Sequence, residues 1–245
     1  MRDQKAGMKK AQGFFLIFLF VACGVLGILV ANQVMNGREK TTPTPILLPT
    51  RTAGAPGTGQ TNLVLLRVDD LSSPAPRLIS IWIAFLGPAD YPGLTVMALY
   101  PNLETPDQIQ PLVDSFALGS DNLPVPEFWQ QLATFNFTWD GYILADAQAI
   151  SPILGWINNT QTTLTAQPAS DGEGFRVILE EETLVFKDIC ATLSNTQEGS
   201  GQAPDWGNII PLHMRTDMTF EAMMYSWGKL NPPGTITPCY ILGNP

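Results

Sequence analysis

Residues 78–99 read LISIWIAFLGPADYPGLTVMAL, two apolar runs joined by a turn. Both runs, 78–86 and 93–99, are rich in β-branched and aromatic residues, which favour strands. Between them stand Gly87-Pro88 and Tyr91-Pro92-Gly93, which are typical turn sequences. We therefore predict an antiparallel hairpin within a β-sheet.

Strands and helices alternate on both sides of this hairpin. Residues 62–68, NLVLLRV, predict a buried strand, and residues 141–145, GYILA, are wholly apolar and predict a central one. Helices are expected at 105–117, 127–134, 147–157, 180–193 and 219–230. Thr105-Pro-Asp-Gln108 has the form of a capping box, and Asp146 is placed to cap the helix that follows it. This alternation predicts an α/β fold for residues 61–245, a layered α-β-α domain with a central mixed sheet.

The N-terminal segment predicts one transmembrane helix at residues 13–34. About 20 apolar residues in a helix span the ~30 Å hydrocarbon core, and none of these residues is charged. The preceding tail, residues 1–12, carries Arg2, Lys5, Lys9 and Lys10 against one acid. This bias predicts a single-pass protein of the cytoplasmic membrane with its N-terminus inside and its C-terminal domain outside.

Two other interpretations of this segment stay open. A cleaved signal peptide would have a shorter apolar core and a better cleavage site than Leu29-Val30-Ala31. Lipidation at Cys23 is the second, although residues 24–31 continue the apolar run. Residues 35–60, rich in Thr, Pro and Gly, predict an extended linker between anchor and domain.

The predicted outer domain is strongly acidic. Residues 61–245 contain six Lys and Arg against twenty Asp and Glu, a net charge of −14. Nucleic-acid binding depends on neutralising phosphates with Lys and Arg, so we exclude nucleic acid as a partner. Two cysteines lie in this domain, Cys190 and Cys239, and thiols on the oxidising side of a membrane commonly pair. The alternative is two separately buried thiols.

Candidate chemistry begins at Asp69-Asp70, directly after the first strand. Adjacent carboxylates at a strand end would suit Mg²⁺, but Asp-Asp-Leu-Ser-Ser-Pro is also a typical turn sequence. His213 is the one histidine of the chain, and a lone histidine is more often a packed or surface residue than a catalytic one. One histidine and two separated cysteines exclude the usual zinc-ligand sets.

The order of these segments resembles the LytR–CpsA–Psr family, also called the cell envelope-related transcriptional attenuator domain. The resemblance covers residues 62–245 and rests on five stretches: 62–69 (NLVLLRVD), 77–83 (RLISIWI), 95–101 (TVMALYP), 137–146 (FTWDGYILAD) and 215–219 (RTDMT). Family members transfer glycopolymers from polyprenyl-pyrophosphate carriers to peptidoglycan, using arginines on the pyrophosphate and carboxylates on Mg²⁺. The resemblance implies ligand-binding roles for Asp69, Arg77 and Asp146.

The sequence departs from the family pattern at most charged positions. Leu71 and Ile79 stand where the family has an arginine and an aspartate, and Pro101-Asn102 stands for an Arg-Asp pair. The arginine-rich approach to a late helix falls near Glu180-Glu-Glu182, which reverses the charge. Loss of one preorganised charge typically costs ~2.7–4 kcal/mol of barrier, so several losses predict a domain that binds without efficient catalysis.

Three functions follow as expectations. The first is a degenerate envelope module that binds a polyprenyl-phosphate carrier or a cell-wall glycan. The second is an active, magnesium-dependent phosphotransferase with a rearranged site, whose candidate catalytic residues are Asp69, Arg77 and Arg215, with Asp69 and Asp70 as metal ligands. The third is a purely structural ectodomain that is cross-linked by a disulfide between Cys190 and Cys239. An open apolar tunnel favours the first, and a filled core favours the third.

Overall fold

The computed structural model describes residues 59–104, 106–158, 163–194, 203–232 and 235–242. The predicted cytoplasmic tail (1–12), the predicted transmembrane helix (13–34) and all but the last two residues of the predicted linker (35–60) lie outside this part. Within the described ranges, no helix combines the length and apolarity needed to cross a bilayer.

The domain is built on a mixed sheet of six strands. They are β1 (Thr61–Val68), β2 (Leu78–Leu86), β3 (Leu94–Tyr100), β4 (Gly141–Ala145), β5 (Met214–Thr216) and β6 (Cys239–Leu242), in the order β5-β4-β1-β2-β3-β6. The predicted hairpin is confirmed, because β2 and β3 pair antiparallel with Leu86 opposite Leu94. β1 pairs antiparallel with β2 and parallel with β4, so the predicted mixed sheet is confirmed as well.

Six helices of the described chain accompany the sheet. They are α2 (Pro106–Asp114), α3 (Pro126–Ala133), α4 (Ala147–Asn158), α5 (Gly172–Leu193), α6 (Trp206–Ile209) and α7 (Phe220–Leu230). The predicted cap of α4 is confirmed, because Asp146 Oδ1 accepts from the backbone N–H groups of Gln148 and Ala149. The capping box proposed for α2 begins at Thr105, which lies outside the described residues.

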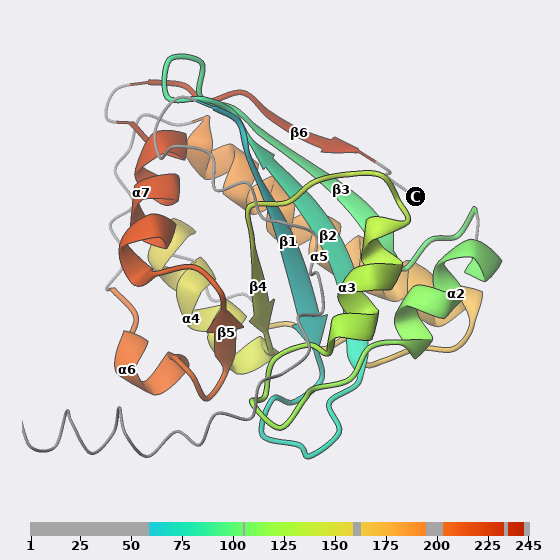
Figure 1. Ribbon diagram of the computed structural model, residues 1–245. Helices are drawn as coiled ribbons and strands as arrows, with labels where there is room; N and C mark the ends of the chain where they lie inside the picture. Colours follow the sequence, from blue (N-terminus) through green and yellow to red (C-terminus); the bar gives the residue numbers. More distant parts are fainter. Residues whose placement is uncertain (1–58, 105, 159–162, 195–202, 233–234, 243–245) are drawn as a thin grey trace, which may run out of the picture. The chain divides into compact units, whose positions relative to one another are not determined.

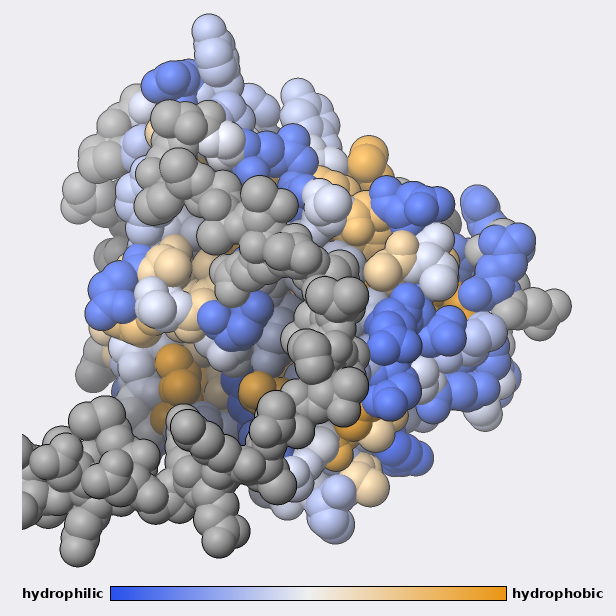
Figure 2. All heavy atoms as spheres, in the orientation of Figure 1, coloured by the Kyte–Doolittle hydropathy of each residue, from blue (hydrophilic) through white to orange (hydrophobic). Residues whose placement is uncertain are grey.

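Apolar side chains fill both faces of the sheet, since strand residues point alternately to opposite sides. On one face, Val64, Ile81 and Leu144 pack with Leu112 of α2 and Phe128 of α3. The other face, with strand residues such as Leu63 and Trp82, packs against Leu179 of α5 and Leu230 of α7. Figure 1 shows α3 in front of the sheet and α5 behind it, which is the predicted α-β-α layering. In Figure 2, hydrophilic side chains dominate the region over α2 and α3.

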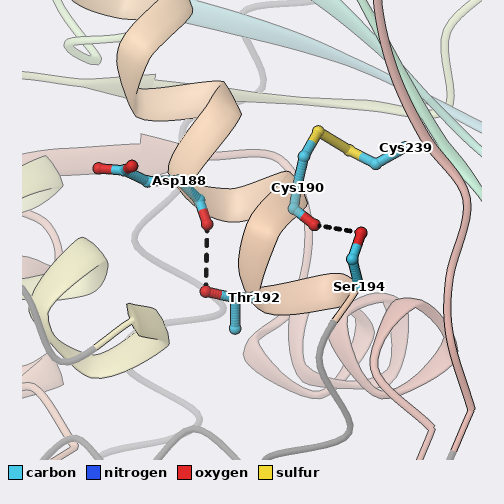
Figure 3. The surroundings of a disulfide bond; sticks show 5 residues. All are labelled: Asp188, Cys190, Thr192, Ser194 and Cys239. Carbon is cyan, nitrogen blue, oxygen red and sulfur yellow. Dashed lines mark hydrogen bonds between the residues drawn. A yellow bond between two sulfur atoms is a disulfide. The ribbon is translucent and has the colours of Figure 1, made fainter.

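The predicted disulfide is present and joins two layers. Cys190, in the last turns of α5, is bonded to Cys239 at the start of the edge strand β6. Figure 3 shows the end of the helix around it, where the Ser194 hydroxyl donates to the Cys190 carbonyl over 2.8 Å. The alternative of two separate thiols is thereby excluded. The bond fixes β6 beside β3, with which it pairs in parallel.

Candidate functional site

The loop after β1 gathers most of the predicted site residues. Its base is closed because the Asp69 backbone N–H donates to the Arg77 carbonyl over 3.1 Å. Their side chains also meet: Asp69 Oδ1 accepts from the Arg77 backbone N–H at 2.8 Å, and Asp69 Oδ2 lies 3.0 Å from Arg77 Nε. The structure thus joins two predicted residues in one ion pair, in which the arginine side chain is 69% exposed.

Asp70 faces a different partner from its neighbour. Its Oδ1 accepts from the Ser72 backbone N–H at 2.8 Å and from the Ser72 hydroxyl at 2.6 Å. These hydrogen bonds hold the pKa of Asp70 below its usual range. Asp70 therefore shapes a turn inside the loop, as the sequence Asp-Asp-Leu-Ser-Ser-Pro also suggests.

The two adjacent carboxylates do not by themselves fit a magnesium ion, which requires near-octahedral coordination by oxygen. Asp69 already faces Arg77 and the backbone N–H of Asp70, and Asp70 closes the turn at Ser72. Within the described ranges, no three His, Cys, Asp or Glu side chains gather where they could hold a metal. Magnesium binding by Asp69 and Asp70 stays a prediction from the sequence.

Asp146 is fully buried and binds the same loop from the other side. Its Oδ2 accepts from the Leu71 backbone N–H at 3.2 Å and lies 2.9 Å from His213 Nδ1. Its exposure is 1%, whereas the His213 side chain is 22% exposed. A buried carboxylate at this distance favours the tautomer with the proton on Nδ1, which leaves Nε2 as a proton acceptor.

Arg215 joins this group through the backbone. Its guanidinium donates to the Leu71 carbonyl at 3.1 Å and to the Asn122 carbonyl at 2.9 Å, so it links the loop after β1 to the loop before α3. β5 places it there, because Arg215 pairs with Leu144 of β4. Both backbone groups of Leu71 are therefore bound by side chains: Asp146 accepts from its N–H, and Arg215 donates to its carbonyl.

These residues meet where ligand sites of α/β sheets commonly form. β1 and β4 are parallel neighbours, so their carboxyl ends lie at one edge of the sheet, and crevices beyond such ends often bind ligands. A cavity of about 750 Å³ lies there, lined by Leu71, Ser72, Asn122, His213 and Arg215 among others. An oriented imidazole beside it is suited to accept a proton from a bound hydroxyl or water.

A second cavity, apolar throughout most of its wall, adjoins this one and shares the side chains of Met214, Met218, Phe220 and Met223 with it. Its volume is about 310 Å³, and it runs between the strands and helices α4, α5 and α7. Six of its larger lining residues are Leu63, Trp82, Ile153, Trp156, Phe186 and Trp227. A hydrocarbon is the ligand that such a wall accepts, because it offers few hydrogen-bonding groups.

The charged residues of this wall belong to a buried cluster around Arg67. Arg67 Nη1 lies 2.8 Å from Glu181 Oε2 and 3.0 Å from Glu182 Oε1, and Nη2 donates to the Ala166 carbonyl at 3.0 Å. Glu182 also accepts from the Ser80 hydroxyl at 2.7 Å. Arg67 and Glu182 are both about nineteen-twentieths buried, and Arg67 Nε has no hydrogen-bond partner among the described atoms.

The two glutamates respond to this environment in opposite ways. Burial raises the pKa of Glu182, and the neighbouring Arg67, Ser80 and Trp82 only partly offset it. Burial acts in the same direction on Glu181, but hydrogen bonds from Thr165 and Arg67 outweigh it and lower the pKa of that carboxyl. Both carboxyls come from the acidic stretch Glu180-Glu-Glu182, and they offset the charge of Arg67.

Sequence reasoning missed the roles of Arg67 and His213. A signal for Arg67 exists, because a charged residue inside the otherwise apolar run NLVLLRV must find a partner when that strand is buried. His213 carries no comparable signal, since its partner Asp146 is 67 residues away in the sequence. Asp69, Arg77, Asp146 and Arg215 were all expected at a site. The first two close the base of the loop 69–77, and the other two bind its Leu71.

Comparisons with known proteins find likeness in structure alone, since no family model and no functionally described protein matches the sequence. A structure titled TagT bound to LI-WTA shares 7% identity, with a TM-score of 0.45 over 77% of this chain and 80% of that one. TagV of B. subtilis shares 6% identity, with a TM-score of 0.41 over 76% and 85%. A putative transcriptional regulator, ywtF of Bacillus subtilis, shares 7%, with a TM-score of 0.44 over 77% and 79%. At these scores the likeness assigns no activity.

Proposed function

We propose that this chain is a membrane-anchored protein of the cell envelope whose outer domain binds the hydrocarbon chain of a polyprenyl-linked compound without efficient catalysis. The anchor is the predicted helix at 13–34, with the N-terminus in the cytoplasm. The resemblance of residues 62–245 to the LytR–CpsA–Psr family supplies the class of ligand. The observation that carries the proposal is the apolar cavity of about 310 Å³ beside α4, α5 and α7.

The apolar wall of this cavity supports a hydrocarbon ligand there. Removing apolar surface from water typically contributes ~25 cal/mol per Å². A hydrocarbon chain would cover apolar side chains such as Leu63, Trp82 and Phe186, because apolar cavities attract apolar ligands rather than water.

The surrounding charges support binding without efficient transfer. Transfer from a pyrophosphate requires cations that neutralise the leaving group. In the described domain, Arg67 is bonded to Glu181 and Glu182, and Arg77 is paired with Asp69. Arg215 directs donors to two backbone carbonyls. These cations are therefore already engaged within the protein.

A binding experiment tests the proposal. Farnesyl phosphate, a short polyprenyl phosphate, is titrated into the purified full chain while tryptophan fluorescence is followed, because Trp82, Trp156 and Trp227 line the cavity. Ala84 is buried in the same wall, so Ala84→Phe should weaken binding about tenfold or more by occupying the space. Ala75→Phe, in the exposed part of the loop after β1, is the matched control and should bind normally.

Two results would remove the proposal. One is a wild-type chain that binds neither farnesyl phosphate nor farnesol at any concentration below micelle formation. The other is equal affinity in wild type and Ala84→Phe, with unchanged thermal unfolding. Binding of farnesol as tightly as farnesyl phosphate would show that the hydrocarbon, and not the phosphate, is recognised.

The alternative function is an active phosphotransferase with a rearranged site, and one observation favours it. His213 is oriented by the buried Asp146 at the edge of the cavity that Arg215 also lines. Such a group could activate a hydroxyl. Magnesium-dependent release of phosphate from farnesyl pyrophosphate, abolished in Asp69→Asn and His213→Ala, would establish this function. No release above the uncatalysed rate would eliminate it.

A further inference from the structure

A third cavity lies on the sheet face opposite the apolar one, and its walls are aromatic. Its volume is about 1040 Å³, and it is bordered by the loop before α3, the loop between α3 and β4, and the start of β4. We call it the aromatic cleft and define it by Trp129, Phe137, Trp139 and Tyr142. It does not share a lining residue with the apolar cavity.

The four aromatic rings of the cleft form one connected surface. The rings of Trp129 and Trp139 are stacked with their centroids 5.7 Å apart, and Trp129 also contacts Tyr142 at 4.8 Å. Phe137 adjoins Trp139 at 5.8 Å. Trp129 and Tyr142 are buried, but Phe137 and Trp139 come from a loop and are only half-buried. Both rings pack on one side against the hydrophobic core of this sheet face, and they also line the cleft.

Polar groups complete the lining of the aromatic cleft. Hydroxyl and amide side chains are contributed by Ser120, Asn136 and Thr138, and carboxylates by Asp121, Asp140 and Asp217. Among the described residues that line it, none is a lysine, arginine or histidine. These three carboxylates give the lining of the cleft a net negative charge. Burial, and then the charges of Asp217 and Asp121, raise the pKa of Tyr142 to about 12, although the charge of Arg215 acts in the opposite direction.

This combination excludes most ligand classes. A net negative charge in the lining disfavours phosphates, teichoic acids and other anions. Carboxylates and amides around the wall disfavour a pure hydrocarbon, because they would lose their hydrogen bonds to water. A compact ammonium ion would use the carboxylates and ring faces but not the donors of Ser120, Asn136 and Thr138, whereas a sugar would use all of these groups.

We infer that the aromatic cleft is a binding site for an uncharged carbohydrate. The C–H groups on one face of a sugar ring carry a small positive charge and pack on the negative faces of aromatic rings. The hydroxyls of the same sugar both donate and accept hydrogen bonds, so they match carboxylates together with amides and hydroxyls. The volume of about 1040 Å³ slightly exceeds the ~300–1,000 Å³ usual for ligand sites, which allows several sugar units.

The inference is independent of the proposed lipid site. It concerns another face of the sheet and a soluble ligand without a hydrocarbon chain. The probes are two neutral oligosaccharides, chitotetraose and maltotetraose, which differ in their acetamido groups. Each is titrated into the purified full chain and followed by saturation-transfer NMR and by tryptophan fluorescence. We expect at least one of them to bind, with sugar-ring protons receiving magnetisation from aromatic residues.

Variants of the wall and of the polar lining locate the site. Trp139→Ala should weaken saccharide binding about tenfold or more. Asp121→Asn should weaken it several-fold, and because Asp121 is exposed this change leaves the core intact. The matched controls are Tyr91→Ala, which removes an aromatic ring that is 80% exposed in the β2–β3 turn, and Asp90→Asn beside it. Both controls should bind as wild type does.

Salt and a cationic probe separate a sugar site from a cation site. Saccharide binding should be unchanged between about 0.1 M and 1 M NaCl, whereas a cation bound by carboxylates would be displaced as the Debye length falls from ~10 to ~3 Å. Binding of tetramethylammonium in place of both oligosaccharides would overturn the inference. The absence of saccharide binding at millimolar concentration would also overturn it. So would equal saccharide affinity in wild type, Asp121→Asn and Trp139→Ala, provided that Trp139→Ala is folded.

Discussion

Arg67 is the residue that decides the charge of the apolar cavity. It lies next to the end of the buried strand β1, and Glu181 and Glu182 each contact its guanidinium. Two carboxylates around one guanidinium do not leave a site for a pyrophosphate. Buried ion pairs of this kind add little net stability, but loss of one member leaves the other charge buried without a partner.

The first prediction at the residue scale concerns this cluster. Arg67→Met should lower the free energy of unfolding by about 3–5 kcal/mol, because Glu182 then remains buried without its counter-charge. The double variant Arg67→Met/Glu182→Gln should recover part of this loss. Urea denaturation of the full chain followed by circular dichroism measures both. Lys187→Met, an exposed position of α5, is the control and should change the free energy by less than about 0.5 kcal/mol. Equal changes in the free energy of unfolding in Arg67→Met and Lys187→Met would contradict a buried ion pair between Arg67 and Glu182.

The second prediction at this scale concerns pH. The folded-state pKa of Glu181 is lowered, so its contribution to stability is present above the ordinary glutamate pKa of about 4.3 and is lost as the pH falls through the folded-state value. Wild type should therefore be more stable than Glu181→Gln at pH 7. The difference should shrink as the pH falls below about 4.3. Thermal unfolding of both chains between pH 7 and pH 3 tests this, and a difference that grows on acidification would refute the assignment.

At the scale of the elements, the sequence predicted those strands and helices whose bounds are set by a local pattern of residues. β1 to β4 were expected within a residue or two, because each is an apolar run of strand length bounded by turn residues. The start of α5 was missed by eight residues, because Gly172 and Gly174 are poor helix formers. The cause of the earlier start is Asp171, whose side chain accepts from the Gly174 backbone N–H at 2.8 Å. One cap thus outweighs two unfavourable residues.

β5 and β6 were missed for a different reason. They have three and four residues, too few to show an alternating pattern, and their positions depend on partners far away in the sequence. β6 pairs with β3, and its first residue is bonded to Cys190. The cysteine pair was predictable from compartment chemistry, but the strand that it holds was not. Long-range pairing is therefore the information that the sequence patterns lack.

The prediction at the element scale concerns this bond. Replacement of both Cys190 and Cys239 by serine should lower the free energy of unfolding by about 2–4 kcal/mol, because the closed loop spans 49 residues. Amide exchange should quicken in residues 94–97, which pair with β6. Hydrogen exchange with mass spectrometry measures this. Protection in β1 and β4 should change much less, and uniform loss of protection would show that the bond supports the whole sheet instead.

At the scale of the whole molecule, the site was partly predictable. The residues expected at the site do converge on the loop 69–77, because the parallel β1 and β4 bring their carboxyl ends together. The pairing of Asp146 with His213 and the engagement of Arg67 could not be predicted, since both depend on packing between distant segments. Cavities are still harder to foresee, because an apolar sequence does not reveal whether side chains fill the space between layers.

The sheet separates the two proposed ligands by alternation along its strands. In β4, Tyr142 lies in the wall of the aromatic cleft, and the next residue, Ile143, lies in the wall of the apolar cavity. Neighbouring positions of one strand therefore face ligands of different chemistry. A one-residue shift of β4 against β1 would exchange the two surfaces, which makes its register essential to both sites.

The short outer strands of the sheet have one further consequence. β2, with nine residues, lies inside, while the edges are formed by β5 and β6 with three and four. Short edges give neighbouring molecules little backbone to pair with, which protects β proteins from aggregation. A chain made under reducing conditions would hold β6 less firmly and could expose the longer β3 as a template for fibril growth. Protein in which Cys190 and Cys239 are bonded is thus the form that we expect to stay dispersed.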